Sequence, residues 1–107
     1  MADRYRLASV EQRELIPGHR GRFVHSEHTT HVYWEIEEGS QLPEHSHPHE
    51  QIVNLLQGTY ELVVDGETHR LETGEVLVIP GGAVHSGMAH TDCHILDVFS
   101  PVREEYR

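Results

Sequence analysis

Hydrophobic and polar positions alternate through much of the chain from residue 21 onward. In the segment His31 to Glu37, three large apolar residues share one face, namely Val32, Trp34 and Ile36. The polar and aromatic residues between them fall on the other face, which is the period of a half-buried β-strand. Residues 22–25 continue this pattern upstream, so we expect two early strands joined by a turn.

Strands are also predicted over residues 59–65, 67–72, 76–79 and 92–100. The pair Asp65-Gly66 between the first two of these is typical of a two-residue hairpin turn. After residue 79 a Pro-Gly-Gly turn ends the strand, and His85 begins the next. Apart from an ambiguous segment, 4–15, no stretch of ten or more residues has a helical apolar period. At least eight short strands with closely spaced turns predict an all-β fold, a small antiparallel jelly-roll barrel.

A chain of 107 residues has room for one domain with one core. We divide it into an N-terminal arm (1–20), the barrel (21–100) and a C-terminal tail (101–107). A small basic cluster, His19, Arg20 and Arg22, lies where the arm meets the barrel, and we interpret it as a solvated edge.

The composition excludes some classes of partner. The chain has 18 acidic and only 8 basic residues, which disfavours nucleic acid as a partner. No apolar run is long enough for a membrane span. The start of the chain lacks a secretory apolar segment, and the single Cys93 cannot form an internal disulfide. We therefore expect a cytoplasmic protein. An anionic substrate would need a local positive centre in so acidic a chain.

Histidines at two-residue spacing, His45, His47 and His49, mark the middle of the chain. In an extended strand His45 and His47 project from the same face, where their rings can converge on one ion. Pro48 favours a bend that would return Gln51 toward them. These residues predict half of a metal site. The role of His49 stays open.

The missing ligand is expected from the second half of the chain, where His85 follows the Pro-Gly-Gly turn. Three neutral imidazoles and the Gln51 amide would leave the full charge of a divalent ion uncancelled, making it a strong Lewis acid. The donor set suits one divalent transition metal and does not distinguish nickel, zinc, iron, cobalt or manganese. A second metal site from His25, His28 and His31 is the weaker alternative, because their spacing of three suits a helix.

The last predicted strand places Asp97 on the same face as Ile95 and Phe99. A buried carboxylate is costly unless it is paired or used in chemistry, and burial would raise its pKa toward the range of a general base. The alternatives are a bond to a nearby arginine or a strand of reversed parity. Phe99 is either a core aromatic or part of a substrate pocket. Arg103 could bind a carboxylate or pair with the glutamates that follow it.

Two glycine-framed segments resemble the paired motifs of the cupin superfamily. The first motif is matched by Gly39, His45, His47, Gln51 and Gly58, with Gln in place of the usual acidic ligand. The second is matched by Gly74, Pro80, Gly82 and His85, while Ala89 replaces an Asn. The resemblance implies the same jelly-roll barrel.

A closer resemblance is carried by HSHPHEQI, VDGE and the ending DVFSPVREEY. These segments are similar to the small single-domain cupins of pectin and alginate breakdown, the KdgF type. That resemblance implies metal-dependent ring opening of 4,5-unsaturated monouronates, small anionic sugar acids, by a homodimeric enzyme. It implies metal ligands at His45, His47, Gln51 and His85, and catalytic residues at Asp97, Phe99 and Arg103.

Two other functions stay open at this point. One is an iron-dependent cupin dioxygenase, because three histidines with open positions could activate oxygen. The other is a non-catalytic, metal-dependent module that binds sugar acids.

Overall fold

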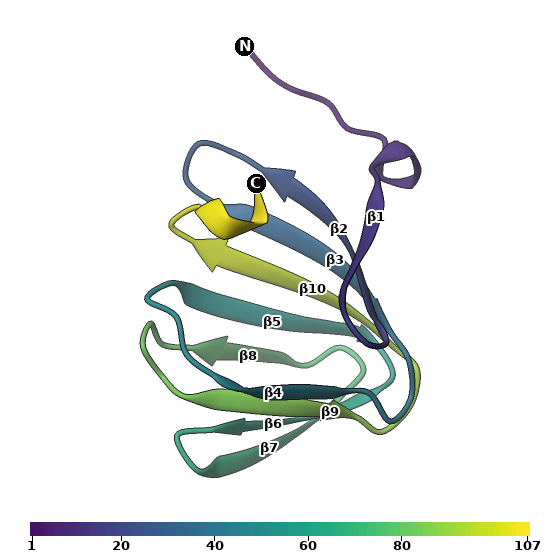
Figure 1. Ribbon diagram of the computed structural model, residues 1–107, viewed down its shortest axis with the longest axis vertical. Helices are drawn as coiled ribbons and strands as arrows, with labels where there is room; N and C mark the ends of the chain where they lie inside the picture. The colour runs from purple at the N-terminus through teal and green to yellow at the C-terminus, as the bar shows by residue number, and fades with distance from the viewer.

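Ten β-strands form two antiparallel sheets that curve toward each other as a jelly-roll barrel in the computed structural model, which describes residues 1–107 (Figure 1). One sheet has the strand order β1-β2-β3-β10-β5-β8, and the other has the order β4-β9-β6-β7. The six-stranded sheet comprises β1 (Gln12–Ile16), β2 (His19–His25), β3 (Thr30–Ile36), β10 (Cys93–Ser100), β5 (Glu50–Gln57) and β8 (Val76–Ile79). The four-stranded sheet comprises β4 (Gln41–His45), β9 (His85–Ala89), β6 (Thr59–Val64) and β7 (Glu67–Glu72). The predicted fold is confirmed.

Strand β10 lies at the centre of the larger sheet, since it pairs with β3 on one side and β5 on the other. Its alternate residues Cys93, Ile95, Asp97 and Phe99 are buried, as the sequence pattern predicts. On β3, Val32, Trp34 and Ile36 are buried opposite them. The inward faces of the two sheets thus share one apolar core, and the carboxylate of Asp97 lies within it.

Turn chemistry sets the register of the smaller sheet. Asp65 and Gly66 both have positive φ angles, 47° and 82°, the backbone of the tight hairpin turn predicted for this pair. Strands β7 and β8 begin and end at the predicted residues.

No helix in the structure has the length and apolar character needed to cross a membrane.

Two expectations differ from the structure. The segment 1–20, predicted as an arm, contains β1 and the start of β2, and β1 pairs with β2 in the six-stranded sheet. His45 and His47 do not share one strand, because β4 ends at His45 and His47 lies in the loop before β5. Pro48 in that loop cannot donate to a β-ladder, which explains why the strand is interrupted there.

Candidate metal centre

Three histidines from two distant segments of the sequence meet at one place in the barrel. His45 ends β4 and His85 begins β9, and the two residues are direct partners in the antiparallel ladder. His47 joins them from the loop between β4 and β5. Ring nitrogens of the three residues lie within 4.8 Å of one another, which positions them to bind a metal ion.

The backbone fixes the tautomer of each ring. Every Nδ1 atom lies 2.9–3.1 Å from a carbonyl oxygen, that of Pro43 for His45, His49 for His47 and Ala83 for His85. A carbonyl only accepts hydrogen bonds, so each neutral ring carries its proton on Nδ1 and leaves the Nε2 lone pair bare. Bare Nε2 atoms with oriented rings are what a transition metal requires.

Burial keeps two of these rings neutral. Desolvation, followed by the nearby positive charge of Arg103, lowers the pKa of His47 to about 4. Burial also lowers the pKa of His85, against the bond to its backbone carbonyl. Both side chains are therefore unprotonated at neutral pH and free to donate their lone pairs.

Gln51, the second residue of β5, brings its amide to the same cluster. Its Oε1 atom lies 3.1 Å from Nε2 of His47. With Nδ1 protonated, that Nε2 and the amide oxygen are both acceptors, and an acceptor pair facing each other is satisfied by a cation between them. Nε2 of His85 is buried and has no hydrogen-bond partner in the protein. The residues thus fit a divalent transition metal held by nitrogen and amide oxygen.

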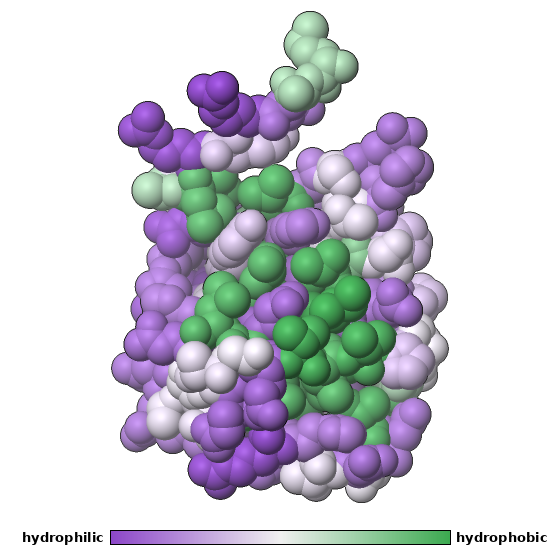
Figure 2. Space-filling view, turned by 180° about the vertical axis from the view of Figure 1, so that it is seen from behind, coloured by the Kyte–Doolittle hydropathy of each residue, from purple (hydrophilic) through white to green (hydrophobic).

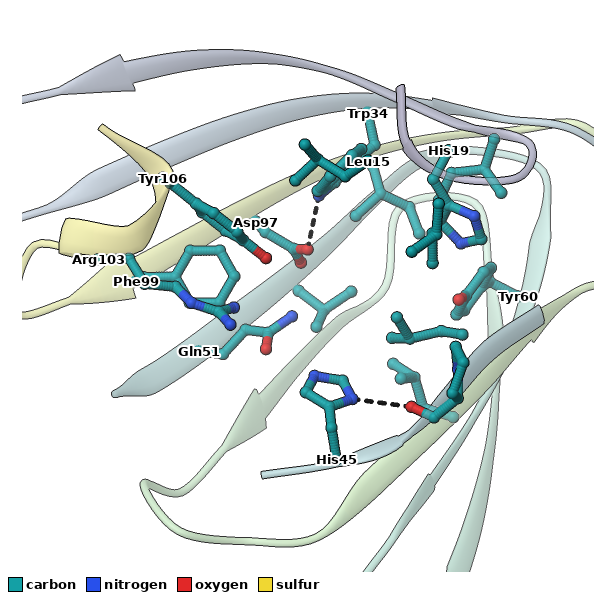
Figure 3. A pocket seen from close by; sticks show the side chains of 17 residues that line it. Leu15, His19, Trp34, His45, Gln51, Tyr60, Asp97, Phe99, Arg103 and Tyr106 are labelled. Carbon is teal, nitrogen blue, oxygen red and sulfur yellow. Dashed lines mark hydrogen bonds between the residues drawn. The ribbon is translucent and has the colours of Figure 1, made fainter. Parts of the chain in front are cut away.

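A cavity of about 320 Å³ adjoins the cluster. Its apolar wall comes from both sheets, and its polar groups include His45, Gln51, Asp97 and Arg103 (Figure 3). The size is at the lower end of the roughly 300–1,000 Å³ of small-molecule sites. An apolar pocket with a few convergent polar groups is the usual form of a ligand site.

Asp97 faces this cavity from β10. Its Oδ2 accepts a hydrogen bond of 3.0 Å from the Trp34 indole, whereas its buried Oδ1 has no partner in the protein (Figure 3). Burial raises the pKa of Asp97 to about 6, against smaller opposing effects of Gln51, Trp34 and Arg103. The Gln51 amide nitrogen is turned toward Asp97 in Figure 3, although the pair falls short of normal hydrogen-bond geometry. Trp34 therefore fixes the orientation of the carboxylate through Oδ2, and Oδ1 is left available to accept a hydrogen bond or a proton from a ligand.

Arg103 and Phe99 form one side of the cavity. The Arg103 guanidinium lies 4.9 Å from the centre of the Phe99 ring and 4.2 Å from that of Tyr106, while its Nε donates to Glu105 at 2.9 Å. Arg103 thus pairs with one of the glutamates that follow it, as one alternative predicted, and it also lines the cavity. Phe99 is 1% exposed and also contacts the His47 ring, so it belongs to the core and the pocket together.

Several cavity residues were not predicted as site residues. Tyr106, in the 3-10 helix Glu104–Tyr106, and Tyr60, on β6, line the cavity, and neither stands in a motif that would reveal it. His19 was interpreted as part of a solvated edge, which is wrong: it is 4% exposed and lines the same cavity. Its position on the inward face of β2 explains the burial.

The histidines of the alternative metal site lie apart from the three-histidine group. His25 bonds through one ring nitrogen to Thr30 at 2.9 Å and through the other to the backbone of Tyr106 at 3.2 Å. The only cluster with metal-ligand spacing is that of His45, His47 and His85, so the alternative site at His25, His28 and His31 is not formed. His49 is buried beside His47, with its Nδ1 unpartnered.

Comparison with known proteins points to one family. A family model described as Cupin domain matches residues 32–99. KdgF from Halomonas sp. is similar over 100% of both chains, with 25% identity and a TM-score of 0.93. No curated protein gives a significant match.

Two further solved structures show the fold alone. An RmlC-like cupin from Shewanella frigidimarina is 23% identical over 94% of this chain and 91% of its own, with a TM-score of 0.88. A salicylate 1,2-dioxygenase from Pseudoaminobacter salicylatoxidans is 18% identical over 81% of this chain, with a TM-score of 0.77, but only 26% of its own chain is covered.

Proposed function

This chain belongs to the cupin family, and from that premise we propose that it is a metal-dependent enzyme that opens the ring of 4,5-unsaturated monouronates derived from pectin or alginate. The observation that carries the proposal is the position of Asp97, whose unpartnered Oδ1 faces the same cavity as His45 and Gln51. The resemblance to KdgF-type cupins supplies the substrate class.

The metal would be held by His45, His47, His85 and the Gln51 amide. Because these four groups are neutral, a bound divalent ion would keep its full charge and stabilise negative charge that develops on a substrate oxygen. The chain carries a formal net charge of -10, so a local positive centre of this kind is needed to attract an acid.

The proposed reaction is an isomerisation in which Asp97 moves one proton. Its ionised carboxylate takes the proton of the anomeric hydroxyl. The bond between C1 and the ring oxygen then breaks, and the former hydroxyl oxygen forms a C1=O double bond. The protonated Asp97 then returns the proton to C4, and the former enol oxygen on C5 becomes a carbonyl. No oxidant, reductant or water is consumed. A pKa of about 6 suits a group that accepts and then releases a proton near neutral pH.

Arg103 and the aromatic wall would hold the substrate for this step. The guanidinium can bind the sugar's carboxylate, and its stacking on Phe99 and Tyr106 limits its movement. The apolar lining lowers the local dielectric, which strengthens electrostatic contacts in the cavity.

The test is to incubate the metal-analysed protein with lyase-generated unsaturated monouronates and follow loss of their ultraviolet absorbance. Asp97→Asn keeps the shape and the Trp34 bond but cannot accept a proton, so we expect a loss of at least about 100-fold in kcat with metal content unchanged. Near-normal turnover in this variant contradicts the assignment. Saturable uronate binding without absorbance loss indicates a binding module. Iron-dependent oxygen uptake indicates a dioxygenase.

We also propose that the chain is a homodimer that associates through the outward face of β10, β5 and β8. Val76, Val78 and Leu56 on this face are 53–55% exposed, and green residues gather at its centre in the view from behind (Figure 2). Among the outward positions of the three strands, Glu50 at the start of β5 is the only acidic residue, and residues 52, 54, 56, 76, 78, 94, 96, 98 and 100 carry no acidic side chain. Two copies of an acidic chain can therefore meet at the centre of this face with Glu50, at its edge, as the only acidic residue among the outward positions.

Sedimentation equilibrium tests this proposal. Val78→Lys should shift the protein to monomers, because it places a charge in the centre of the contact. Val84→Lys is the matched control, since Val84 is also exposed but lies outside these strands. A monomeric wild type, or a dimer unaffected by Val78→Lys, contradicts the proposed face.

A further inference from the structure

His19 presents an unpartnered acceptor to the cavity. Its Nδ1 lies 3.1 Å from the carbonyl oxygen of Pro17, so the neutral ring carries its proton there and leaves Nε2 as an acceptor. That Nε2 is buried, and no protein group pairs with it. Burial also lowers the pKa of His19, which keeps the ring neutral at physiological pH.

The ring is held in this orientation by its surroundings. Trp34 contacts it edge-on, with ring centres 6.2 Å apart and an angle of 84° between the planes. Figure 3 shows His19 across the cavity from Arg103 and Phe99, on the side where the Tyr60 hydroxyl also lies. The cavity thus has two polar ends with apolar residues between them.

The chemistry of the two ends differs. The end at His45 and Arg103 is cationic when a metal is bound and suits a carboxylate or another oxygen anion. The end at His19 offers a neutral acceptor, which suits a hydroxyl donor and disfavours a second anion. A hydrogen bond made there would be shielded from water by the apolar wall, and a ligand without a donor would leave Nε2 unsatisfied.

We propose that His19 determines ligand specificity by accepting a hydrogen bond from a hydroxyl group of the bound sugar acid, at the end of the molecule remote from its carboxylate. The inference rests on the proposed function for the class of ligand. It adds a residue from β2, outside both cupin motifs, to the recognition of that ligand.

Isothermal titration calorimetry of the nickel-loaded protein tests the proposal with two acids. D-galacturonate carries hydroxyl groups, whereas cyclohexanecarboxylate has a similar ring and carboxylate but no hydroxyl. His19→Phe should weaken galacturonate binding about tenfold and change cyclohexanecarboxylate binding less than about twofold. His19→Gln, which keeps an acceptor near the position of Nε2, should restore most of the difference. Arg20→Gln is the control, because Arg20 is the exposed neighbour of His19 and pairs only with Glu37 on the surface.

Melting temperature and nickel content show whether each variant is folded, and His19→Leu replaces His19→Phe if the larger ring prevents folding. Equal weakening of both acids, or of neither, overturns the inference about His19. Selective loss of galacturonate binding without turnover of unsaturated uronates by the wild type supports His19 and contradicts ring opening. A wild type that binds neither acid overturns the inference about His19, whereas ring opening is contradicted only by a lack of turnover of unsaturated uronates.

Discussion

At the scale of single residues, the site depends on polar groups, all buried except the half-buried His45, that are each satisfied on one side only. The three clustered histidines bond to backbone carbonyls through Nδ1, and Asp97 accepts from Trp34 through one oxygen. In each case the other atom faces the cluster or the cavity. Such groups are costly in the free protein, and a ligand or ion can recover that cost on binding.

Asp97 should show this cost in its pH dependence. Its pKa is raised from 3.8 to about 6, so the penalty on the folded state is absent below pH 3.8 and complete above about pH 6. Asp97→Asn should therefore raise the free energy of unfolding of the metal-free protein at pH 8, by up to about 3 kcal/mol. Urea unfolding at several pH values checks this. The gain should shrink between pH 6 and pH 4, and a gain that is constant with pH contradicts the burial of an ionised carboxylate.

At the scale of elements, the turns hold the ligand-bearing segments together. Gly82, in the turn before His85, has a φ of 83° and donates its N–H to the carbonyl oxygen of His47 at 2.8 Å. Gly66, in the β6–β7 hairpin, has nearly the same φ of 82°, and a Cβ at either position would meet nothing within 4 Å. The two glycines differ mainly in their surroundings: the Gly82 turn is bonded to the backbone of the metal-ligand candidate His47, whereas the Gly66 turn only joins β6 to β7.

Alanine at either glycine should cost about 1 kcal/mol of stability, because both conformations are left-handed. Only Gly82→Ala should also weaken metal binding, since strain in that turn acts on the segment between His47 and His85. Thermal unfolding measures the first effect and metal titration the second. Equal metal affinity in the two variants would contradict the proposal that the Gly82 turn positions the metal ligands.

Elements with strong local signals were predictable from the sequence. Strand β7 follows the Asp65-Gly66 turn and β8 ends at the Pro-Gly-Gly turn, so their bounds are set by a proline with a fixed φ and by glycines that can adopt the positive φ angles these turns require. The inward position of Asp97 followed from alternation along β10. The clustering of His45, His47 and His85 followed from motif spacing, while their carbonyl partners could not be named because these depend on backbone directions in loops.

The burial of His19 was not predictable for a different reason. It stands beside Arg20 and Arg22, and charged neighbours in the sequence usually indicate an exposed segment. In a strand, however, alternate residues face opposite sides, so His19 is buried while Arg20 and Arg22 pair with glutamates on the outer face. Tyr106 was missed because a three-residue helix leaves no periodic pattern.

At the scale of the whole molecule, the metal centre connects the two sheets. His45 and His85 belong to the four-stranded sheet, whereas Gln51 belongs to the six-stranded sheet, and His47 lies on the loop between them. An ion held by all four would oppose separation of the sheets. Binding to the folded state alone stabilises a protein by mass action, by about 2.7 kcal/mol at 100 times the dissociation constant.

We therefore expect nickel or zinc to raise the melting temperature of the metal-free protein, and a chelator to reverse the rise. In the Asp97→Asn variant, which lacks the opposite contribution of the carboxylate, the metal-free protein should lose stability as the pH falls from 6.5 toward 4, since the pKa values of His47 and His85 are lowered in the folded state and only the unfolded chain takes up those protons. Calorimetry with and without ion measures both effects. His85→Ala should abolish the ion-dependent rise, whereas His28→Ala, at an exposed histidine outside the cluster, should leave it unchanged. A rise that survives His85→Ala would mean that the ion binds elsewhere.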